Sequence, residues 1–238
     1  MTWQDASQEV RSALSKNADV GIARHLRTKK WVIPMLNDKH RNCLYEASIS
    51  EACSTALDNL DVKKENGIVR VLDIGSGTGL LAMMAAKCMQ KLSSQSKVEV
   101  TSLEMASAMT RIAQETIKSN SLDTVVSVKE GHSCEATPYS DGEKAILCTS
   151  ELLESGFLGE GIIPALRDAW ERHLAADAIV VPKKARIYAQ VIEGGHYINS
   201  IHGPIHGPSN VALRTSGSDK DVFLGSAGGI LLPIHAES

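Results

Sequence analysis

Short apolar runs alternate along the chain with stretches in which apolar residues recur at helical spacing. The apolar runs predict five strands, at residues 68–72, 98–103, 125–128, 145–148 and 179–181. The helical spacing between them predicts helices at residues 80–92, 107–119 and 164–174. Strands that alternate with helices in this way are typical of βαβ units, so we predict an α/β fold: a doubly wound, Rossmann-like parallel sheet with helices on both faces.

The two ends of the chain have a different character. Helical spacing is weak before Pro34, which breaks the pattern, and stronger from there to Leu60. After Pro182 the chain turns rich in Gly, Ser, Pro and His, with one strand-like run at 185–192. We therefore predict an N-terminal helical segment, a Rossmann-like cofactor-binding domain and the start of a β-rich lobe, at residues 1–60, 61–182 and 183–238.

The first strand runs directly into a glycine-rich turn, Asp73-Ile74-Gly75-Ser76-Gly77-Thr78-Gly79. Glycine lets a ligand approach the backbone closely, and the helix that follows aims its free N–H groups outward. The second strand ends on Glu104, at the same edge of the sheet, where a carboxylate suits the two hydroxyls of a ribose. These features predict a nucleotide-like ligand; the alternative is a tight turn that binds nothing.

Residue 80 decides between two classes of cofactor. A dinucleotide site would carry a glycine there, whereas this chain has Leu80. The turn therefore favours a cofactor with an adenosine end and no pyrophosphate, which is S-adenosylmethionine.

A second acidic feature follows the fourth strand. The segment 150–161, SELLESGFLGEG, places Glu151 at the end of a buried strand and Glu160 at the end of a glycine-containing loop. Two carboxylates that converge there match the several N–H donors of a planar guanidinium. The alternative is an acidic loop that faces solvent, because charge clusters usually do.

Composition narrows the choice of partners. The chain has 238 residues, 43% of them hydrophobic and 22% charged, with a net charge of -3. This balance counts against a broad nucleic-acid-binding face. A membrane-spanning helix needs about 18 consecutive apolar residues, and no stretch of the chain approaches that length. Five scattered cysteines without a CxxC pair, and a start without a secretory signal, lead us to expect reduced thiols in a cytoplasmic or nuclear protein.

Four segments together resemble the protein arginine methyltransferases: VLDIGSGTG, Glu104, SELLESGFLGEG and MLNDKHRN. The resemblance spans roughly residues 31–193 and is closest to the branch with tandem methyltransferase modules, which includes the monomethylating enzymes, although the acidic loop is also similar to that of a dimethylating relative. It implies methyl transfer from S-adenosylmethionine to arginine in protein substrates. Family members often pair through an arm, which would fall around Gly194; this implies a dimer or a tandem-module partner, although no arm is recognisable.

The resemblance also implies roles for single residues. Arg41 would pair with the cofactor carboxylate, Asp73, Gly75 and Gly77 would belong to the cofactor site, and Glu104 would hold the ribose. Ser133 stands where the adenine edge is usually met, and Met35 would line the active site. Glu151 and Glu160 would clamp the substrate guanidinium and act as the catalytic pair.

The chain departs from the family pattern in two places. The family's first helix supplies tyrosines over the cofactor, whereas here only Trp31 could substitute. The family's β lobe carries a Thr-His-Trp loop, and 183–238 has no match and is too short to close a barrel, so we predict an incomplete β-barrel-type lobe. His202 and His206 would share a face only on a helix, which the Gly-Pro context forbids, so we predict no metal site.

These departures keep two other functions open. One is a catalytically impaired module that binds cofactor or a partner and regulates another subunit. The other is a methyltransferase for a different substrate, such as a small molecule or RNA, although the acidic loop argues against RNA because acidic clefts repel phosphates.

Overall fold

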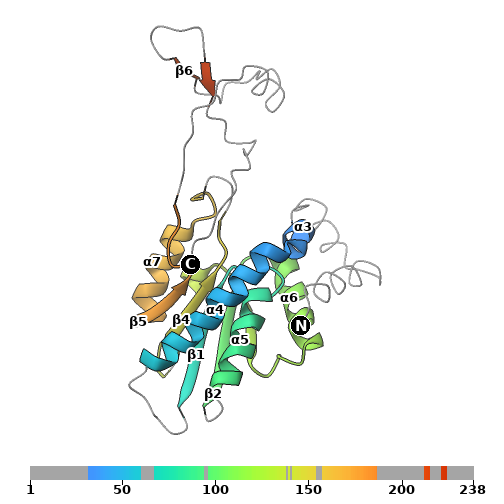
Figure 1. Cartoon of the computed structure of the whole chain (residues 1–238), viewed down its shortest axis with the longest axis vertical. Coiled ribbons are helices and arrows are strands. Elements are labelled where there is room, and N and C mark those ends of the chain that lie inside the picture. Colours follow the sequence, from blue (N-terminus) through green and yellow to red (C-terminus); the bar gives the residue numbers. More distant parts are fainter. Residues whose placement is uncertain are drawn as a thin grey trace.

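The computed structural model describes residues 32–59, 67–93, 96–137, 139, 141–153 and 157–186, and the backbone of two short strands further on. Within these ranges a five-stranded sheet lies between helices (Figure 1). Its strands are β1 (Ile68–Ile74), β2 (Lys97–Glu104), β3 (Val126–Glu130), β4 (Ala145–Ser150) and β5 (Leu174–Val181). All neighbours pair in parallel in the order β3-β2-β1-β4-β5, which confirms the predicted doubly wound sheet.

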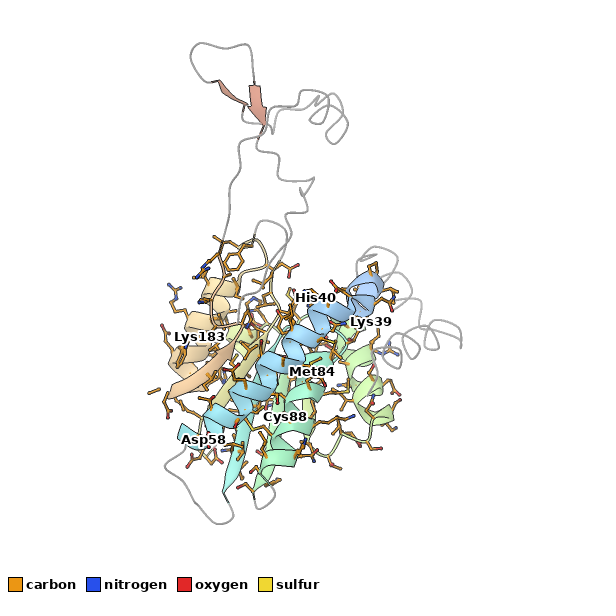
Figure 2. All side chains as sticks on the ribbon, viewed as in Figure 1. Lys39, His40, Asp58, Met84, Cys88 and Lys183 are labelled. Carbon is orange, nitrogen blue, oxygen red and sulfur yellow. The ribbon has the colours of Figure 1, made fainter. Side chains whose placement is uncertain are left out.

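Helices cover both faces of this sheet. They are α3 (Val32–Asn37), α4 (Lys39–Asn59), α5 (Leu80–Leu92), α6 (Ser107–Ser119) and α7 (Ile162–Arg172), with a 3-10 turn, η1, at Ser133–Glu135. In Figure 1, α4 and α5 lie next to each other over the sheet. Figure 2 shows Lys39 and Asp58 at opposite ends of α4, and Cys88 of α5 facing α4, where its Sγ lies 3.8 Å from Ser50 Oγ.

The central strand β1 is buried on both faces because its side chains alternate between two hydrophobic clusters. Val69 and Val71 pack with apolar residues of α4, α5 and α6. Leu72 and Ile74 pack on the other face against α7, through Ala165 and Ala169. This explains why β1 reads as an almost continuous apolar run rather than an alternating one.

Two details differ from the sequence prediction. Pro34 does not break a helix: it lies in the first turn of α3, where proline's missing N–H would have no helical partner anyway. Leu174, predicted on the last helix, begins β5 instead, because α7 ends at Arg172. Its side chain is buried in the same cluster as Ala169, so an apolar residue is needed there in either conformation.

The β-rich lobe lies mostly outside the described residues, as does most of the predicted strand 185–192. Two strands are described, β6 (Ala212–Arg214) and β7 (Asp221–Phe223), which pair antiparallel with each other. The three domain boundaries stay predictions. In the described part of the chain, no helix has the length and apolar character needed to cross a membrane.

Candidate active site

The sheet changes direction between β1 and β4. From β1 the chain winds outward through β2 and β3, then returns to the other side of β1 as β4. Ligands of open α/β sheets bind at such a switch point, beyond the carboxyl ends of the strands. The glycine turn follows β1 and Glu151 follows β4, so both predicted halves of the site lie at this point.

Backbone geometry makes glycine necessary in the turn. Gly75, Gly77 and Gly79 have φ angles of 82°, 55° and 84°, in the left-handed region. The N–H groups of Gly75 and Ser76 donate to the Leu103 carbonyl at 2.9 and 3.0 Å, which anchors the turn on β2. A Cβ on Gly75 would stand 2.8 Å from Leu152 Cδ2. Leu80 begins α5 and packs into a cluster with α3 and α6.

Glu104 is fixed by two backbone donors. Its Oε2 accepts from the Gly77 N–H at 2.9 Å and its Oε1 accepts from the Ala106 N–H at 2.8 Å. The side chain is almost buried, and each carboxylate oxygen can accept more than one hydrogen bond. The carboxylate therefore joins the glycine turn to the start of α6 and keeps acceptor capacity for a further donor.

Asp73 ties three strands together beneath the turn. It is 1% exposed, and it accepts hydrogen bonds from Ser102 Oγ of β2 at 2.6 Å and Thr149 Oγ1 of β4 at 2.7 Å. Burial raises the Asp73 pKa to about 6, against the opposing effect of these two hydrogen bonds. Its described contacts are structural, and its contact with a cofactor stays a prediction.

Arg41 and Glu151, which the sequence assigns to different ligands, pair with each other. Arg41 Nη2 lies 3.2 Å from Glu151 Oε2, and the Arg41 guanidinium stacks over the Tyr45 ring, 5.0 Å from its centroid. Burial raises the Glu151 pKa, Arg41 lowers it, and the charge of Glu160 raises it again. The carboxylate at the end of β4 therefore already binds one guanidinium, with a second carboxylate near enough to affect it.

The remaining predicted residues lie on several other elements. Glu160 is exposed in the turn before α7, and residues 154–156 of the acidic loop lie outside the described ranges. Met35 is half-buried on α3, and Ser133 begins η1 after β3. Trp31 and the histidines of the β lobe also lie outside the described residues, as do any contacts they make.

Two polar residues that contact predicted site residues were not recognised in the sequence. Asn42 is completely buried: its amide donates to the Leu36 carbonyl at 3.0 Å, and its Oδ1 accepts from Arg41 Nη1 at 3.0 Å. Arg172, at the end of α7, donates to carbonyls of the η1 turn. Asn42 lies within the MLNDKHRN motif, but its contacts depend on the packing of α3 on α4. The carbonyls that Arg172 binds are more than thirty residues away from it in the sequence.

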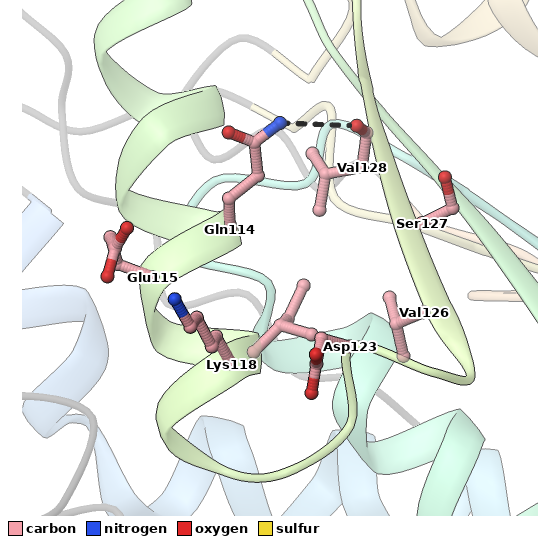
Figure 3. Close-up of a pocket in the computed structure, with 8 residues that line it drawn as sticks. Gln114, Glu115, Lys118, Asp123, Val126, Ser127 and Val128 are labelled. Atoms are coloured by element: carbon pink, nitrogen blue, oxygen red, sulfur yellow. Dashed lines mark hydrogen bonds between the residues drawn. The ribbon is translucent and has the colours of Figure 1, made fainter.

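A shallow hollow lies elsewhere, between α6 and β3 (Figure 3). It has a volume of about 300 Å³ and includes Gln114, whose amide donates to the Val128 carbonyl at 3.5 Å. Lys118, in the last turn of α6, and Val126, the first residue of β3, both line the hollow. The hollow therefore lies at the amino edge of the sheet, opposite the glycine turn. None of the predicted site residues lines it.

A family model matches the part of the chain that carries the predicted cofactor residues and ends before the acidic loop. Residues 9–142 match the family model described as Protein-L-isoaspartate(D-aspartate) O-methyltransferase (PCMT). The match ends before Glu151, so it places the cofactor-binding half of the chain in that family and does not reach the acidic loop.

Curated relatives extend through the acidic loop. Protein arginine N-methyltransferase 7 of Oryza sativa subsp. japonica is 33% identical over 163 residues, which are 68% of this chain and 21% of that protein. Arginine N(omega)-methyltransferase of Streptomyces achromogenes subsp. streptozoticus is 30% identical over 215 residues, 89% of this chain and 53% of that protein. The chain thus spans about half of one relative and about a fifth of the other.

The fold has a solved counterpart. The Trypanosoma brucei PRMT1 enzyme-prozyme heterotetrameric complex with AdoHcy aligns with a TM-score of 0.55 at 24% identity, over 70% of this chain and 46% of that one. This similarity confirms the Rossmann-like methyltransferase fold of the described sheet.

Proposed function

Because this chain belongs to the protein arginine N-methyltransferase family, we propose that it transfers a methyl group from S-adenosylmethionine to a guanidinium nitrogen of arginine in protein substrates. This is the family that the sequence resembles, whereas membership of the branch with tandem modules stays a prediction. One observation carries the proposal: Glu151 holds the Arg41 guanidinium at 3.2 Å, beside Glu160. A site that binds one guanidinium in this way has the chemistry to bind another.

The residues at the carboxyl edge fit S-adenosylmethionine. Ser76 Oγ, in the glycine turn, is buried and has no hydrogen-bond partner within the described structure, so a polar ligand would satisfy it. Glu104 would accept from the ribose hydroxyls, Arg41 would pair with the carboxylate, and Ser133 would meet the adenine edge. When bound, the cofactor supplies a methyl group already activated by a sulfonium, so the protein needs no metal to activate it.

The two glutamates would prepare the acceptor. A free guanidinium is a poor nucleophile because its positive charge is delocalised over three nitrogens. Glu151 and Glu160 would draw that charge away from the attacking nitrogen and orient this nitrogen for transfer. The nitrogen that gains the methyl group gives up one proton, which a glutamate carboxylate or water would accept. The two glutamates repel each other unless a cation lies between them, and this favours a cationic substrate.

The Arg41–Glu151 pair implies an order of binding. Arg41 occupies Glu151 Oε2 and competes with the substrate guanidinium for this carboxylate, and the carboxylate of the cofactor is the anion that would draw Arg41 away. Cofactor binding therefore frees the acceptor carboxylate, and we expect the cofactor to bind first.

Two other methyl acceptors, isoaspartate and free arginine, are alternatives to arginine in a protein. The matched O-methyltransferase family is named for isoaspartate, whose carboxylate Glu151 and Glu160 would repel. The Streptomyces relative is named for arginine rather than protein arginine, so free arginine is the second candidate acceptor.

The test is methyl transfer from labelled S-adenosylmethionine to four acceptors. These are an Arg-rich peptide, its Lys-substituted twin, an isoaspartyl peptide and free L-arginine. We expect label in the Arg-rich peptide alone. Label in free arginine alone would replace the protein substrate by a small molecule, and label in the isoaspartyl peptide would contradict the proposal. Cofactor binding without transfer to any acceptor would identify a regulatory module.

The acceptor role of the acidic loop has its own test. Glu160→Gln keeps the shape of the side chain and removes its charge, so we expect kcat to fall about a hundredfold while the Kd for S-adenosylhomocysteine stays within about twofold, because the lost interaction acts on the acceptor and not on the cofactor. A near-normal kcat would contradict the role of Glu160.

A further inference from the structure

The C-terminal end of α7 is bonded to the η1 turn by a single guanidinium. Arg172 Nη1 donates to the Ala136 carbonyl at 2.6 Å, and Nη2 donates to the Ser133 carbonyl at 3.2 Å. Asp168, one helical turn earlier, accepts from Arg172 Nε at 2.8 Å and from Nη2 at 2.6 Å. The guanidinium is therefore held by a carboxylate on one side and binds two backbone carbonyls on the other.

Few other contacts hold this turn: the Cys134 N–H donates to His132 Nδ1 at 3.2 Å, and Ala136 packs, partly buried, against the cluster that contains Ala165 and Ala169. The η1 turn has three residues and buries none of them. A short 3-10 turn has poor hydrogen-bond geometry of its own, and since none of its three residues is fully buried it gains little hydrophobic stabilisation. The helix that carries Arg172 is well anchored, because Ala165 and Ala169 are buried against the sheet. The hydrogen bonds thus add the rigidity of α7 to a turn that is only partly buried.

We propose that Arg172 is a positioning residue for adenine recognition, which with Asp168 fixes the backbone of residues 133–136 so that Ser133 meets the adenine edge. The inference rests on the proposed function, which places Ser133 at the adenine. Arginine is required because one planar group must face a carboxylate and two carbonyls at once, and a lysine ammonium has no such fork. Arg172 itself touches no cofactor in this assignment; it acts through the turn.

Adenine and hypoxanthine differ at the edge in question. Adenine presents an amino donor beside a ring-nitrogen acceptor, whereas hypoxanthine presents a carbonyl acceptor beside an N–H donor. A rigid turn can match one pattern and is mismatched with the other, but a loosened turn accepts both. The ratio of the two affinities therefore reports the order of the turn separately from overall stability.

The experiment measures calorimetric Kd values of the full chain for S-adenosylhomocysteine and S-inosylhomocysteine. We expect the wild type to prefer the adenosine compound by about tenfold or more, the factor from one mispaired hydrogen bond of about 1.4 kcal/mol. In Arg172→Lys and Arg172→Ala the ratio should fall toward one, chiefly through weaker binding of the adenosine compound. Asp168→Asn should give an intermediate ratio, because Arg172 keeps its carbonyls and loses its fork partner.

Arg167→Lys is the matched control, because Arg167 is an exposed arginine on the same helix. It should leave both affinities unchanged. An unchanged ratio in both Arg172 variants, or an equal loss for both ligands, would overturn the positioning role even if cofactor binding is confirmed. A wild type that binds neither ligand would instead refute the proposed function. If Arg172→Ala does not fold, Arg172→Lys and Asp168→Asn still decide the question.

Discussion

The carboxyl group of Asp73 is buried away from water, and the two hydrogen bonds that it accepts only partly offset the effect of burial on its pKa. Burial raises the pKa of Asp73 from 3.8 to about 6, although two hydroxyls donate to it. Below pH 3.8 the carboxyl is protonated in both folded and unfolded chains, and above pH 6 it is ionised in both. Between these values the unfolded chain loses the proton first, so this group's stabilising contribution is lost as pH rises, by about 3 kcal/mol in total.

Asp73→Asn removes this titration and keeps the shape of the side chain. The free energy of unfolding of the variant minus that of the wild type should therefore increase between pH 4 and pH 6.5 and stay constant above that. Urea unfolding at half-unit pH steps measures this difference. A difference that does not change with pH would mean that Asp73 ionises in the folded protein as it does in the unfolded chain.

We predict that Asn42 affects cofactor binding through Arg41. Its buried amide joins the Leu36 carbonyl to the Arg41 guanidinium, so Asn42→Ala should leave Arg41 poorly oriented. We expect the Kd for S-adenosylhomocysteine to rise about tenfold, from the loss of one charged hydrogen bond. The Kd for 5′-methylthioadenosine, which lacks the carboxylate, should not change. Asn37→Ala, at an exposed asparagine of α3, is the control, and equal weakening of both ligands would contradict this role of Asn42.

At the scale of elements, the strand-turn-helix unit of β1 and α5 depends on the space around its first glycine. Gly75 and Gly142 have similar φ angles, 82° and 74°, so alanine adds a similar backbone strain of about 1 kcal/mol at each. A Cβ at Gly142 meets nothing within 4 Å, whereas at Gly75 it stands 2.8 Å from Leu152. Because the Leu152 methyl can shift at a modest cost, Gly75→Ala should destabilise the chain by about 1 kcal/mol more than Gly142→Ala, and weaken S-adenosylhomocysteine binding as well.

Chemical denaturation and calorimetry of Gly75→Ala and Gly142→Ala test this comparison. Equal destabilisation by the two substitutions would show that backbone strain alone, and not the contact with Leu152, requires glycine at residue 75.

The elements were predictable wherever one local pattern decides the structure. The run from Ile68 to Leu72 predicts a buried strand, and the spacing of glycines predicts the turn that follows it. Leu174 shows the limit: an apolar residue near the end of a helix satisfies the same buried cluster as one at the start of a strand, so spacing alone does not separate them. Arg172 shows another limit, because its partners lie in η1, and only the packing of α7 beside that turn brings them together.

In the candidate site, the positions of the residues that follow strands were predictable for the same reason. Parallel strands end at one edge, so strand-end residues such as Glu104 and Glu151 can be placed at that edge from sequence. The Arg41–Glu151 ion pair could not be foreseen, because the two residues belong to elements far apart in the chain and the sequence assigns each to a different ligand.

On the scale of the whole molecule, the cofactor site and the predicted β-rich lobe are separate parts of the chain. All five strands of the sheet end by Val181, and every predicted cofactor residue lies before Glu151. The two described strands of the lobe, β6 and β7, pair with each other and not with this sheet. Binding of the cofactor should then depend on residues 1–186, and transfer of the methyl group on the lobe as well.

Deleting residues 187–238 tests this division. We expect S-adenosylhomocysteine to bind the shortened chain with a Kd within about threefold of the full chain, a change of less than about 0.7 kcal/mol, since the deleted segment holds none of the predicted cofactor residues. Methyl transfer to the Arg-rich peptide should fall by about tenfold or more if the predicted lobe binds the substrate, because productive transfer needs a positioned acceptor. Loss of cofactor binding would show instead that the lobe is needed to fold the sheet, and unchanged transfer would show that residues 1–186 hold the complete active site.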